Sequence, residues 1–232
     1  MNLLLLALAL LAQGQEPGTP PTQPTEGPLM SGDRPERSLS PAHDLYYEDS
    51  APPTPEALIA AHDFGACVAD ASAVVATELL TRDFTSRAYD RGLRRLTSDN
   101  RDCFERRGSM RAGSLPIAGA IAERLIERAG EPVNVRLARA ALRPATPGYS
   151  PSDRAAICVV RSVPDDVARL FATEPTGEAE AAVADTLRPV LGACLGSQRP
   201  IEATAAGLRA ILATAALREI HSNAAPVVEA RN

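Results

Sequence analysis

Four cysteines at matched spacing constrain this chain more than any other feature of its sequence. Cys67 and Cys103 lie 36 residues apart (103 − 67), and Cys158 and Cys194 also lie 36 residues apart (194 − 158). The second pair follows the first at an offset of 91 residues (158 − 67). This spacing predicts an internal duplication in which each copy carries two cysteines.

Apolar positions between the cysteines agree with that offset. At 91 residues the matched pairs are Val68 with Val159, Leu79 with Leu170, Leu80 with Phe171, Thr85 with Thr176, Ala88 with Ala179 and Leu96 with Leu187. With one more residue of offset, Ala118, Leu125 and Glu127 match Ala210, Leu217 and Glu219. We therefore expect two similar units of several helices each.

Four cysteines allow three pairings, and exchange of the two copies leaves all three possible. A unit that was duplicated whole most simply carries its own bridge. We therefore predict the disulfides Cys67–Cys103 and Cys158–Cys194. Each would close a loop whose constraint stabilises the fold by roughly 3–4 kcal/mol on the chain-entropy model. The chain contains no C-x-x-C motif, so neither a redox pair nor a zinc knuckle is indicated.

The helical pattern begins at Thr54-Pro55-Glu56, where a capping hydroxyl, a first-turn proline and an acid follow one another. It continues to about Ile220. In the second copy one apolar face consists of Val183, Leu187, Val190, Leu191, Cys194 and Leu195. Pro189 falls inside this face, so we expect a kink or a restart there. A last helix is expected near 117–128 in the first copy and near 207–220 in the second.

Two short segments carry local signals for the start of a helix or for a strand. Ser162-Val163-Pro164-Asp165 resembles a capping box, which predicts a helix that starts at Ser162. Val133, Val135 and Leu137 alternate with polar residues, which fits either a short strand or the start of a helix.

Composition favours closely packed helices. The chain has no Trp, four Phe and four Tyr, so small side chains must fill much of the core. All 24 basic residues are Arg, and the net charge is −5. A protein that binds nucleic acid would be expected to carry a basic balance, so this class is not indicated.

The N-terminus indicates export. An apolar run from Leu3 to Ala12 has the length of a signal-peptide core and is too short to span a bilayer. Ala12-Gln13-Gly14 offers a cleavage site, so we expect a signal peptide over residues 1–14 and no transmembrane span after its removal. A short buried helix is the alternative. The expected location is periplasmic or secreted, where disulfides form.

Residues 15–54 are rich in Pro and Thr, and we expect a disordered tether. Within it, residues 43–50 (HDLYYEDS) could rest on the domain or dock a partner. The expected organisation is then repeat 1 over 55–143, a linker over 144–152, repeat 2 over 153–222 and a frayed C-terminus over 223–232. The fold class is all-α, with two tandem pseudo-symmetric multi-helix units.

No motif for catalysis stands out. The sequence lacks G-x-S-x-G, H-E-x-x-H, a Walker loop and G-x-G-x-x-G. His43, His62 and His221 lie far apart, so no metal site and no cofactor are expected. His62-Asp63 is the one local pair of the kind that catalysis uses, and a helix surface explains it. Asp165-Asp166 suits a helix N-terminus.

One arginine-rich stretch could bind an anionic partner. It contains Arg91, Arg94, Arg95, Arg101, Arg106, Arg107 and Arg111, of which Arg94, Arg95, Arg101, Arg106 and Arg107 form the candidate patch. Asp99, Asp102 and Glu105 neutralise part of its charge. A solvated helix with local ion pairs is the simpler interpretation, and a patch for an anionic partner such as lipopolysaccharide, a phosphate-bearing polymer or an acidic protein surface is the alternative.

Three stretches resemble a known group of proteins. They are CVVRSVPDDVARLFATEP from Cys158, LRPVLGACL from Leu187 and GLRAILATAAL from Gly207. The chain resembles exported hypothetical proteins of sphingomonad-type alphaproteobacteria over roughly residues 64–219. The first copy departs from the pattern at Thr97-Ser98-Asp99-Asn100. The resemblance implies a signal peptide and two cysteine-bearing helical units, and it implies no activity and no catalytic residue.

Together these observations predict an exported envelope protein whose helical domain is a non-catalytic binding or structural module, with an unidentified envelope protein or polymer as its partner. The alternative is a periplasmic hydrolase with an active site in the cleft between the two repeats. A cleft with converging ionisable groups would favour the hydrolase.

Overall fold

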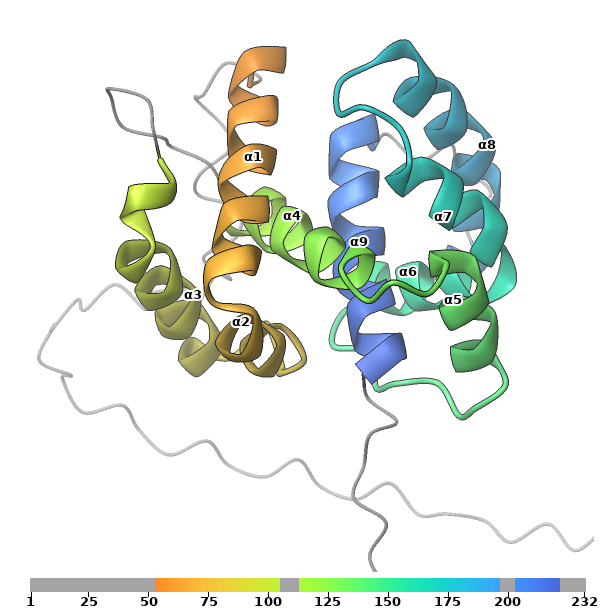
Figure 1. Cartoon of the computed structure of the whole chain (residues 1–232). Coiled ribbons are helices and arrows are strands. Elements are labelled where there is room, and N and C mark those ends of the chain that lie inside the picture. The colour runs from red at the N-terminus through yellow and green to blue at the C-terminus, as the bar shows by residue number, and fades with distance from the viewer. Residues whose placement is uncertain (1–52, 105–112, 197–202, 222–232) are drawn as a thin grey trace, which may run out of the picture. The chain divides into compact units, whose positions relative to one another are not determined.

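The computed structural model describes residues 53–104, 113–196 and 203–221, and within these ranges every regular element is a helix (Figure 1). The elements are α1 (Pro55–Ala71), α2 (Ala73–Leu80), α3 (Arg87–Asp99), the 3₁₀ helix η2 (Arg101–Cys103), α4 (Ser114–Glu127), α5 (Val133–Ala141), α6 (Pro151–Ser162), α7 (Pro164–Phe171), α8 (Glu178–Leu195) and α9 (Ala205–His221). The all-α prediction is confirmed. The expected signal peptide, residues 43–50 and the C-terminal residues 223–232 lie outside the described residues.

Both predicted disulfides are present. Cys67 of α1 is bonded to Cys103 of η2, with 5.6 Å between their Cα atoms. Cys158 of α6 is bonded to Cys194 of α8, with 5.8 Å between their Cα atoms. Disulfides persist in oxidising compartments, so two such bridges indicate a location outside the cytoplasm.

Hydroxyl side chains cap four of the described helices, including α9, where Thr204 Oγ1 accepts a hydrogen bond from the backbone N–H of Gly207. Thr54 Oγ1 accepts a hydrogen bond from the backbone N–H of Ala57, as expected for the start of α1. Ser86 caps α3 and Ser150 caps α6 in the same way. The capping box at Ser162 was a wrong prediction. Ser162 is the last residue of α6, because the backbone N–H of Val163 still bonds to the carbonyl of Val159, and Val163 precedes α7 without a side-chain cap.

The structure also shows which conformation is adopted by the segment that starts at Val133 and by the segment around Pro189. Residues 133–141 form α5, whose inward side chains Val133, Leu137 and Ala140 follow helical spacing rather than the alternation of a strand. Helix α8 continues through Pro189 to Leu195 without a restart.

Helix boundaries in the two halves follow the offset of the cysteines. The starts of α2, α3 and α4 at residues 73, 87 and 114, plus 91, give the starts of α7, α8 and α9 at 164, 178 and 205. The packing differs, since α1 lies mainly along α4 whereas α6 contacts both α8 and α9. Tandem pseudo-symmetry therefore stays a prediction, while the matched boundaries are an observation.

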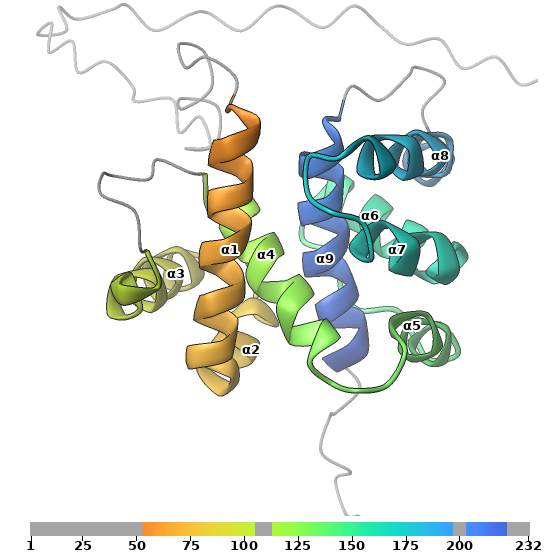
Figure 2. The same cartoon turned by 45° about the horizontal axis from the view of Figure 1, so that its top comes forward.

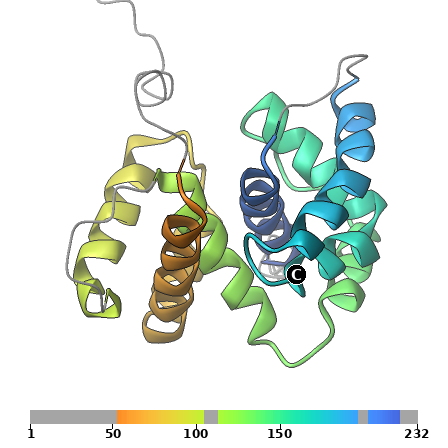
Figure 3. The same ribbon diagram turned by 90° about the horizontal axis from the view of Figure 1, so that it is seen from above.

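Helices α4 and α9 lie side by side in the middle of the described residues, with α1 against α4 and α5 to α8 around α9 (Figures 2 and 3). Glycines permit this close approach. A Cβ on Gly119 would lie 2.5 Å from the Cα of Ala210, and a Cβ on Gly65 would lie 2.5 Å from the Cβ of Ala120. The buried faces between these helices are rich in Ala, Leu and Ile, as the low aromatic content predicts.

Arginine side chains satisfy the carbonyl groups that helix ends leave without partners. Arg128 donates to the carbonyl of Ala69 in the last turns of α1, and Arg136 donates to the carbonyl of Ile126 in α4. Arg161 donates to the carbonyls of Ala140 and Ala141 at the end of α5. These contacts link α1 to the end of α4, the end of α4 to α5, and the end of α5 to α6.

Each half has an ion pair that joins the end of an earlier helix to a later one, and the two pairs have opposite polarity. In the first half Asp70, near the end of α1, pairs with Arg128 at 3.6 Å and also accepts two hydrogen bonds from Arg124. In the second half Arg161, near the end of α6, pairs with Glu219 of α9 at 2.7 Å. The acid thus stands on the earlier helix in the first half and on the later helix in the second.

No single described helix is long and apolar enough to cross a membrane. Helices α1 and α2 meet the length and composition criteria only when taken together, and they are bent by 111° at their junction.

Candidate functional site

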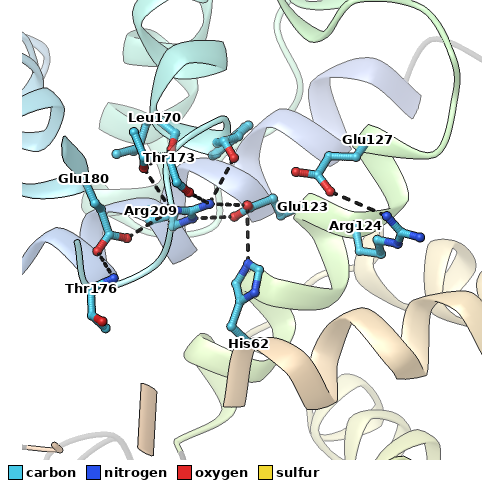
Figure 4. A network of polar contacts seen from close by, with 10 residues as sticks. His62, Glu123, Arg124, Glu127, Leu170, Thr173, Thr176, Glu180 and Arg209 are labelled. Atoms are coloured by element: carbon cyan, nitrogen blue, oxygen red, sulfur yellow. Dashed lines mark hydrogen bonds and ion pairs between the residues drawn. The ribbon is translucent and has the colours of Figure 1, made fainter. Parts of the chain in front are cut away.

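A buried arginine joins the two halves of the fold. Arg209 of α9 is 5% exposed, and its Nε and Nη2 atoms donate to the two carboxylate oxygens of Glu123 on α4 at 2.8 and 2.6 Å (Figure 4). Its Nη1 atom donates to Glu180 of α8 at 3.3 Å. It also donates to the carbonyl of Phe171 at the end of α7 and to Thr173. One guanidinium therefore holds four helices together.

Glu123 has a second partner on α1. His62 Nε2 lies 3.4 Å from Glu123 Oε1, and the His62 side chain is 26% exposed. Burial would raise the pKa of Glu123, but the hydrogen bonds from Arg209 and His62 outweigh it and hold that pKa below its ordinary value. Glu123 is therefore a carboxylate at neutral pH, and it has no proton to donate.

Glu180 forms a buried cluster with Arg209 and Glu123, and it also bonds to a residue whose backbone is strained. Glu180 Oε2 accepts a hydrogen bond from the backbone N–H of Thr176 at 2.8 Å. Thr176 has φ 64°, in the left-handed region that a β-branched residue seldom adopts. Strain of this kind persists where surrounding contacts overdetermine the backbone, and Glu180 supplies such a contact.

These groups surround a small cavity between α1, α4, the α7–α8 connection and α9. Its volume is about 40 Å³, and its polar lining comes from His62, Glu123, Thr176, Glu180 and Arg209. Small-molecule sites usually span hundreds of cubic ångströms. A cavity of this size has room for roughly three water-sized spheres and for no ordinary organic substrate.

A second buried pair anchors the other end of α9. Arg218 is 3% exposed, is bonded to Asp153 of α6, and lies over the rings of Phe84 and Tyr149 at 5.7 and 5.2 Å. Asp153 also accepts from the backbone N–H of Tyr149. Such stacking on aromatic faces stabilises a desolvated guanidinium. This pair links α6, α9 and the segment before α3.

Tyr89 is a further buried ionisable group. It lies on the inner face of α3, and burial raises its pKa to about 12, although the positive charge of Arg218 opposes the shift. Its phenol is therefore neutral at physiological pH.

The charged groups around Arg209 are hydrogen-bonded to one another, and this leaves few of their polar atoms available to contact a substrate. Both carboxylates of the cluster accept from Arg209, and Arg209 donates from all three of its nitrogens. Within the residues that the structure describes, no group of three or more His, Cys, Asp or Glu side chains is placed to hold a metal ion.

The structure places the residues singled out in the sequence at separate positions. The four cysteines form the two bridges, and His62 joins the buried cluster while Asp63 is exposed. Arg94 and Arg95 lie on the exposed face of α3, and Arg101 is exposed on η2. Arg106, Arg107 and Arg111 lie outside the described residues.

Sequence reasoning missed the buried ion pairs. Glu123, Arg209 and Arg218 lie on helices whose apolar pattern is otherwise continuous, as in Leu208-Arg209-Ala210 and Leu217-Arg218-Glu219. A charged residue inside a helix that is apolar on most sides was the available signal, since such a residue is buried with its neighbours and needs a partner.

The chain was compared with models of protein families, with curated proteins and with solved structures, and none of the three comparisons found a match.

Proposed function

We propose that this chain is an exported envelope protein, periplasmic or secreted, whose helical domain is a non-catalytic binding or structural module. One observation carries the proposal. The ionisable groups buried between the two halves are paired with one another around a cavity of about 40 Å³. An active site needs groups that are free to exchange protons or contact a substrate, and these groups are committed to the fold.

Three further features support the export part of this proposal. Two disulfides fit an oxidising compartment. Residues 1–14 have the composition of a signal peptide. The resemblance to exported proteins of sphingomonad-type alphaproteobacteria over about residues 64–219 implies the same location.

The test is expression of the full chain in a bacterial host, followed by fractionation into cytoplasm, periplasm, membrane and medium. We expect a shortened chain that begins near Gln15, in the periplasm or medium, with both disulfides intact on non-reducing peptide mapping. An unprocessed chain with reduced thiols in the cytoplasm would refute export.

A periplasmic hydrolase is the second candidate, and one observation favours it. His62 is partly exposed at the cavity, and Glu123 lies behind its ring, in the manner of a base and the carboxylate that orients it. The described residues provide no serine or cysteine nucleophile in this cavity. Purified protein should therefore leave ester, peptide and glycoside substrates intact, and turnover that His62→Ala abolishes would favour the hydrolase instead.

A further inference from the structure

Helix α3 separates its charged and apolar side chains sharply. Tyr89, Leu93 and Leu96 are buried. On the opposite face Arg87, Arg91, Arg94 and Arg95 are all exposed. They follow the spacing i, i+4, i+7, i+8, which places them along one side of the helix. We name these four residues the α3 arginine row. Helix α3 lies at the outer edge, on the side of α1 away from α9, in the views of Figures 1 and 2.

The arginine row differs from most of the other described arginines in what it contacts. Elsewhere in the described ranges most guanidiniums bond to carboxylates or to the carbonyls of helix ends, as do Arg124, Arg128, Arg136, Arg139, Arg161, Arg169, Arg188, Arg209 and Arg218. Single arginines at other places, such as Arg82, Arg101 and Arg154, are also exposed, but they do not form a row along one helix face. Within residues 53–104, 113–196 and 203–221, the side chains of Arg87, Arg91 and Arg95 make no hydrogen bond and no ion pair. Arg94 pairs with Asp90 at 2.6 Å, and both side chains are largely exposed.

The fold itself does not require this row. Helix α8 starts 91 residues after α3 (178 − 87) and occupies the same place in the order of helices. Adding 91 to positions 87, 91, 94 and 95 gives Glu178, Ala182, Asp185 and Thr186. The corresponding face of α8 thus carries two acids and no cation. The positive charge of α3 is a property of this helix and not of the architecture.

We propose that the α3 arginine row docks the protein on an anionic phospholipid surface. Arg87, Arg91 and Arg95 are spaced by four residues, so they recur about every 6 Å along the helix axis. A row of this kind meets several phosphate groups at once, whereas a single phosphate would need donors that converge in a pocket. The described pockets involve other elements, namely α1, α4, α9 and the face of α2.

Two physical effects make phospholipid headgroups a suitable partner. Guanidinium groups form paired hydrogen bonds with phosphate oxygens. Near an anionic membrane each arginine also gains enough free energy to raise partitioning about fivefold at physiological salt. The unpaired arginines give up no internal contact when they bind. This inference rests on the proposed export, because an envelope protein faces such surfaces.

The test uses the full mature chain with both disulfides formed. Its co-sedimentation is measured with vesicles of phosphatidylcholine alone and with vesicles of phosphatidylcholine and phosphatidylglycerol. The variant Arg87→Gln/Arg91→Gln/Arg95→Gln removes three charges from the row. The matched control, Arg139→Gln/Arg154→Gln/Arg169→Gln, removes three charges from exposed arginines on other helices. Circular dichroism checks that both variants are folded.

We expect the natural chain to bind the mixed vesicles and not the neutral ones, with binding that weakens as salt rises. The α3 variant should lose roughly 100-fold in partition coefficient, the product of three fivefold effects, and the control should lose far less. Equal losses in both variants would assign the binding to net charge and overturn the proposal. So would the absence of binding to mixed vesicles, or complete competition by millimolar inorganic phosphate or by a soluble acidic protein.

The outcome is separable from that of the proposed function. If fractionation shows a processed, disulfide-bonded periplasmic chain while the vesicle assay is negative, the docking surface is refuted and export stands. If the chain is cytoplasmic, export fails regardless of the vesicle result.

Discussion

Arg209 and Glu123, 86 residues apart in sequence, meet through two hydrogen bonds of 2.8 and 2.6 Å in the interior between α4 and α9. Removing one partner of a buried ion pair leaves an uncompensated charge, which destabilises a protein by about 3–5 kcal/mol. We therefore expect Arg209→Met to lower the free energy of unfolding by that amount, since Glu123 and Glu180 both lose their cation. Urea denaturation measures it.

Arg169→Met is the matched control. Arg169 pairs with Asp166 on the surface of α7, and its side chain is 60% exposed. Exposed pairs contribute about 0–1 kcal/mol. A similar small loss for both variants would contradict the structural role of Arg209.

Stability should depend on pH through Glu123. Its pKa is raised by burial but lowered further by Arg209 and His62, so the net shift is downward. A carboxyl with a depressed folded-state pKa stabilises the fold above its unfolded-state pKa of about 4.3. That contribution is lost as the pH falls through the folded-state value. The free energy of unfolding should thus decline more steeply below pH ~4.3 in the natural chain than in Glu123→Gln.

The pKa of Glu127 is shifted in the opposite direction to that of Glu123, so its pH dependence offers a comparison. Burial and the negative charge of Glu123 raise its pKa. Its ionisation therefore opposes folding as the pH rises through the unfolded-state value, and Glu127→Gln should be relatively more stable than the natural chain at neutral pH. Parallel pH profiles for both variants would show that neither shift is coupled to folding.

Each disulfide should contribute a similar amount, because the two loops are equally long at 36 residues of separation. On the chain-entropy model, Cys67→Ala/Cys103→Ala and Cys158→Ala/Cys194→Ala should each lower the free energy of unfolding by roughly 3–4 kcal/mol. Guanidinium denaturation of the two double variants measures this. Losses that differ by more than about 2 kcal/mol would show that the loops are not equivalent in the unfolded state.

The two bridges should differ in their reaction with reductant. Cys67 is exposed, whereas both Cys158 and Cys194 are half-buried. Access of a thiolate limits disulfide exchange. Under mild reductant, Cys67–Cys103 should open first, as followed by timed alkylation and peptide mapping. Earlier labelling of Cys158 would contradict this order.

The contact between α4 and α9 should not tolerate a methyl group at Gly119. A Cβ there would lie 2.5 Å from the backbone Cα of Ala210, so the helices must separate. Overpacking of this kind costs about 1–3 kcal/mol. Gly92→Ala is a suitable control, because its Cβ would meet, also at 2.5 Å, only the tip of the Leu79 side chain, which can rotate away. Thermal denaturation should rank Gly119→Ala well below Gly92→Ala, and the reverse order would refute close packing at Gly119.

Thr176 offers a stabilising substitution. Its φ of 64° is strained for threonine and natural for glycine, so Thr176→Gly should raise the free energy of unfolding by about 1 kcal/mol. Thr85 occupies the matching position in the first half (176 − 91), and its φ is not positive. Its backbone N–H and hydroxyl both bond to Asp83. Thr85→Gly should therefore destabilise, and a gain at both positions would argue against strain at Thr176.

Local features of the sequence predicted local structure well. The cysteine spacing left three pairings possible, and the expectation that each copy carries its own bridge selected the two that the structure contains. Thr54-Pro55-Glu56 identified the start of α1 from capping chemistry alone. The alternation at residues 133–137 remained ambiguous because Val133 and Leu137 lie four residues apart, which satisfies a strand period of two and a helix period of 3.6 alike.

The candidate site was beyond such reasoning for a physical reason. Arg209 pairs with Glu123 across 86 residues and with Glu180 across 29. Which acid meets which cation depends on how α4, α8 and α9 pack, and the pattern of any one helix does not contain that information. The left-handed backbone at Thr176 likewise depends on its bond to Glu180 and cannot be derived from the local letters Pro175-Thr176-Gly177.

The exchanged ion pairs at the ends of α1 and α6 have a consequence for folding specificity. If the two halves are similar enough for their helices to compete, α1 could dock on α9 and α6 on α4. Such a misassembled state would set Asp70 against Glu219 and Arg161 against Arg128, like charge against like in both places. Opposite polarity in the two halves would therefore favour the pairing of each helix with the partner in its own half of the chain over the exchanged pairing.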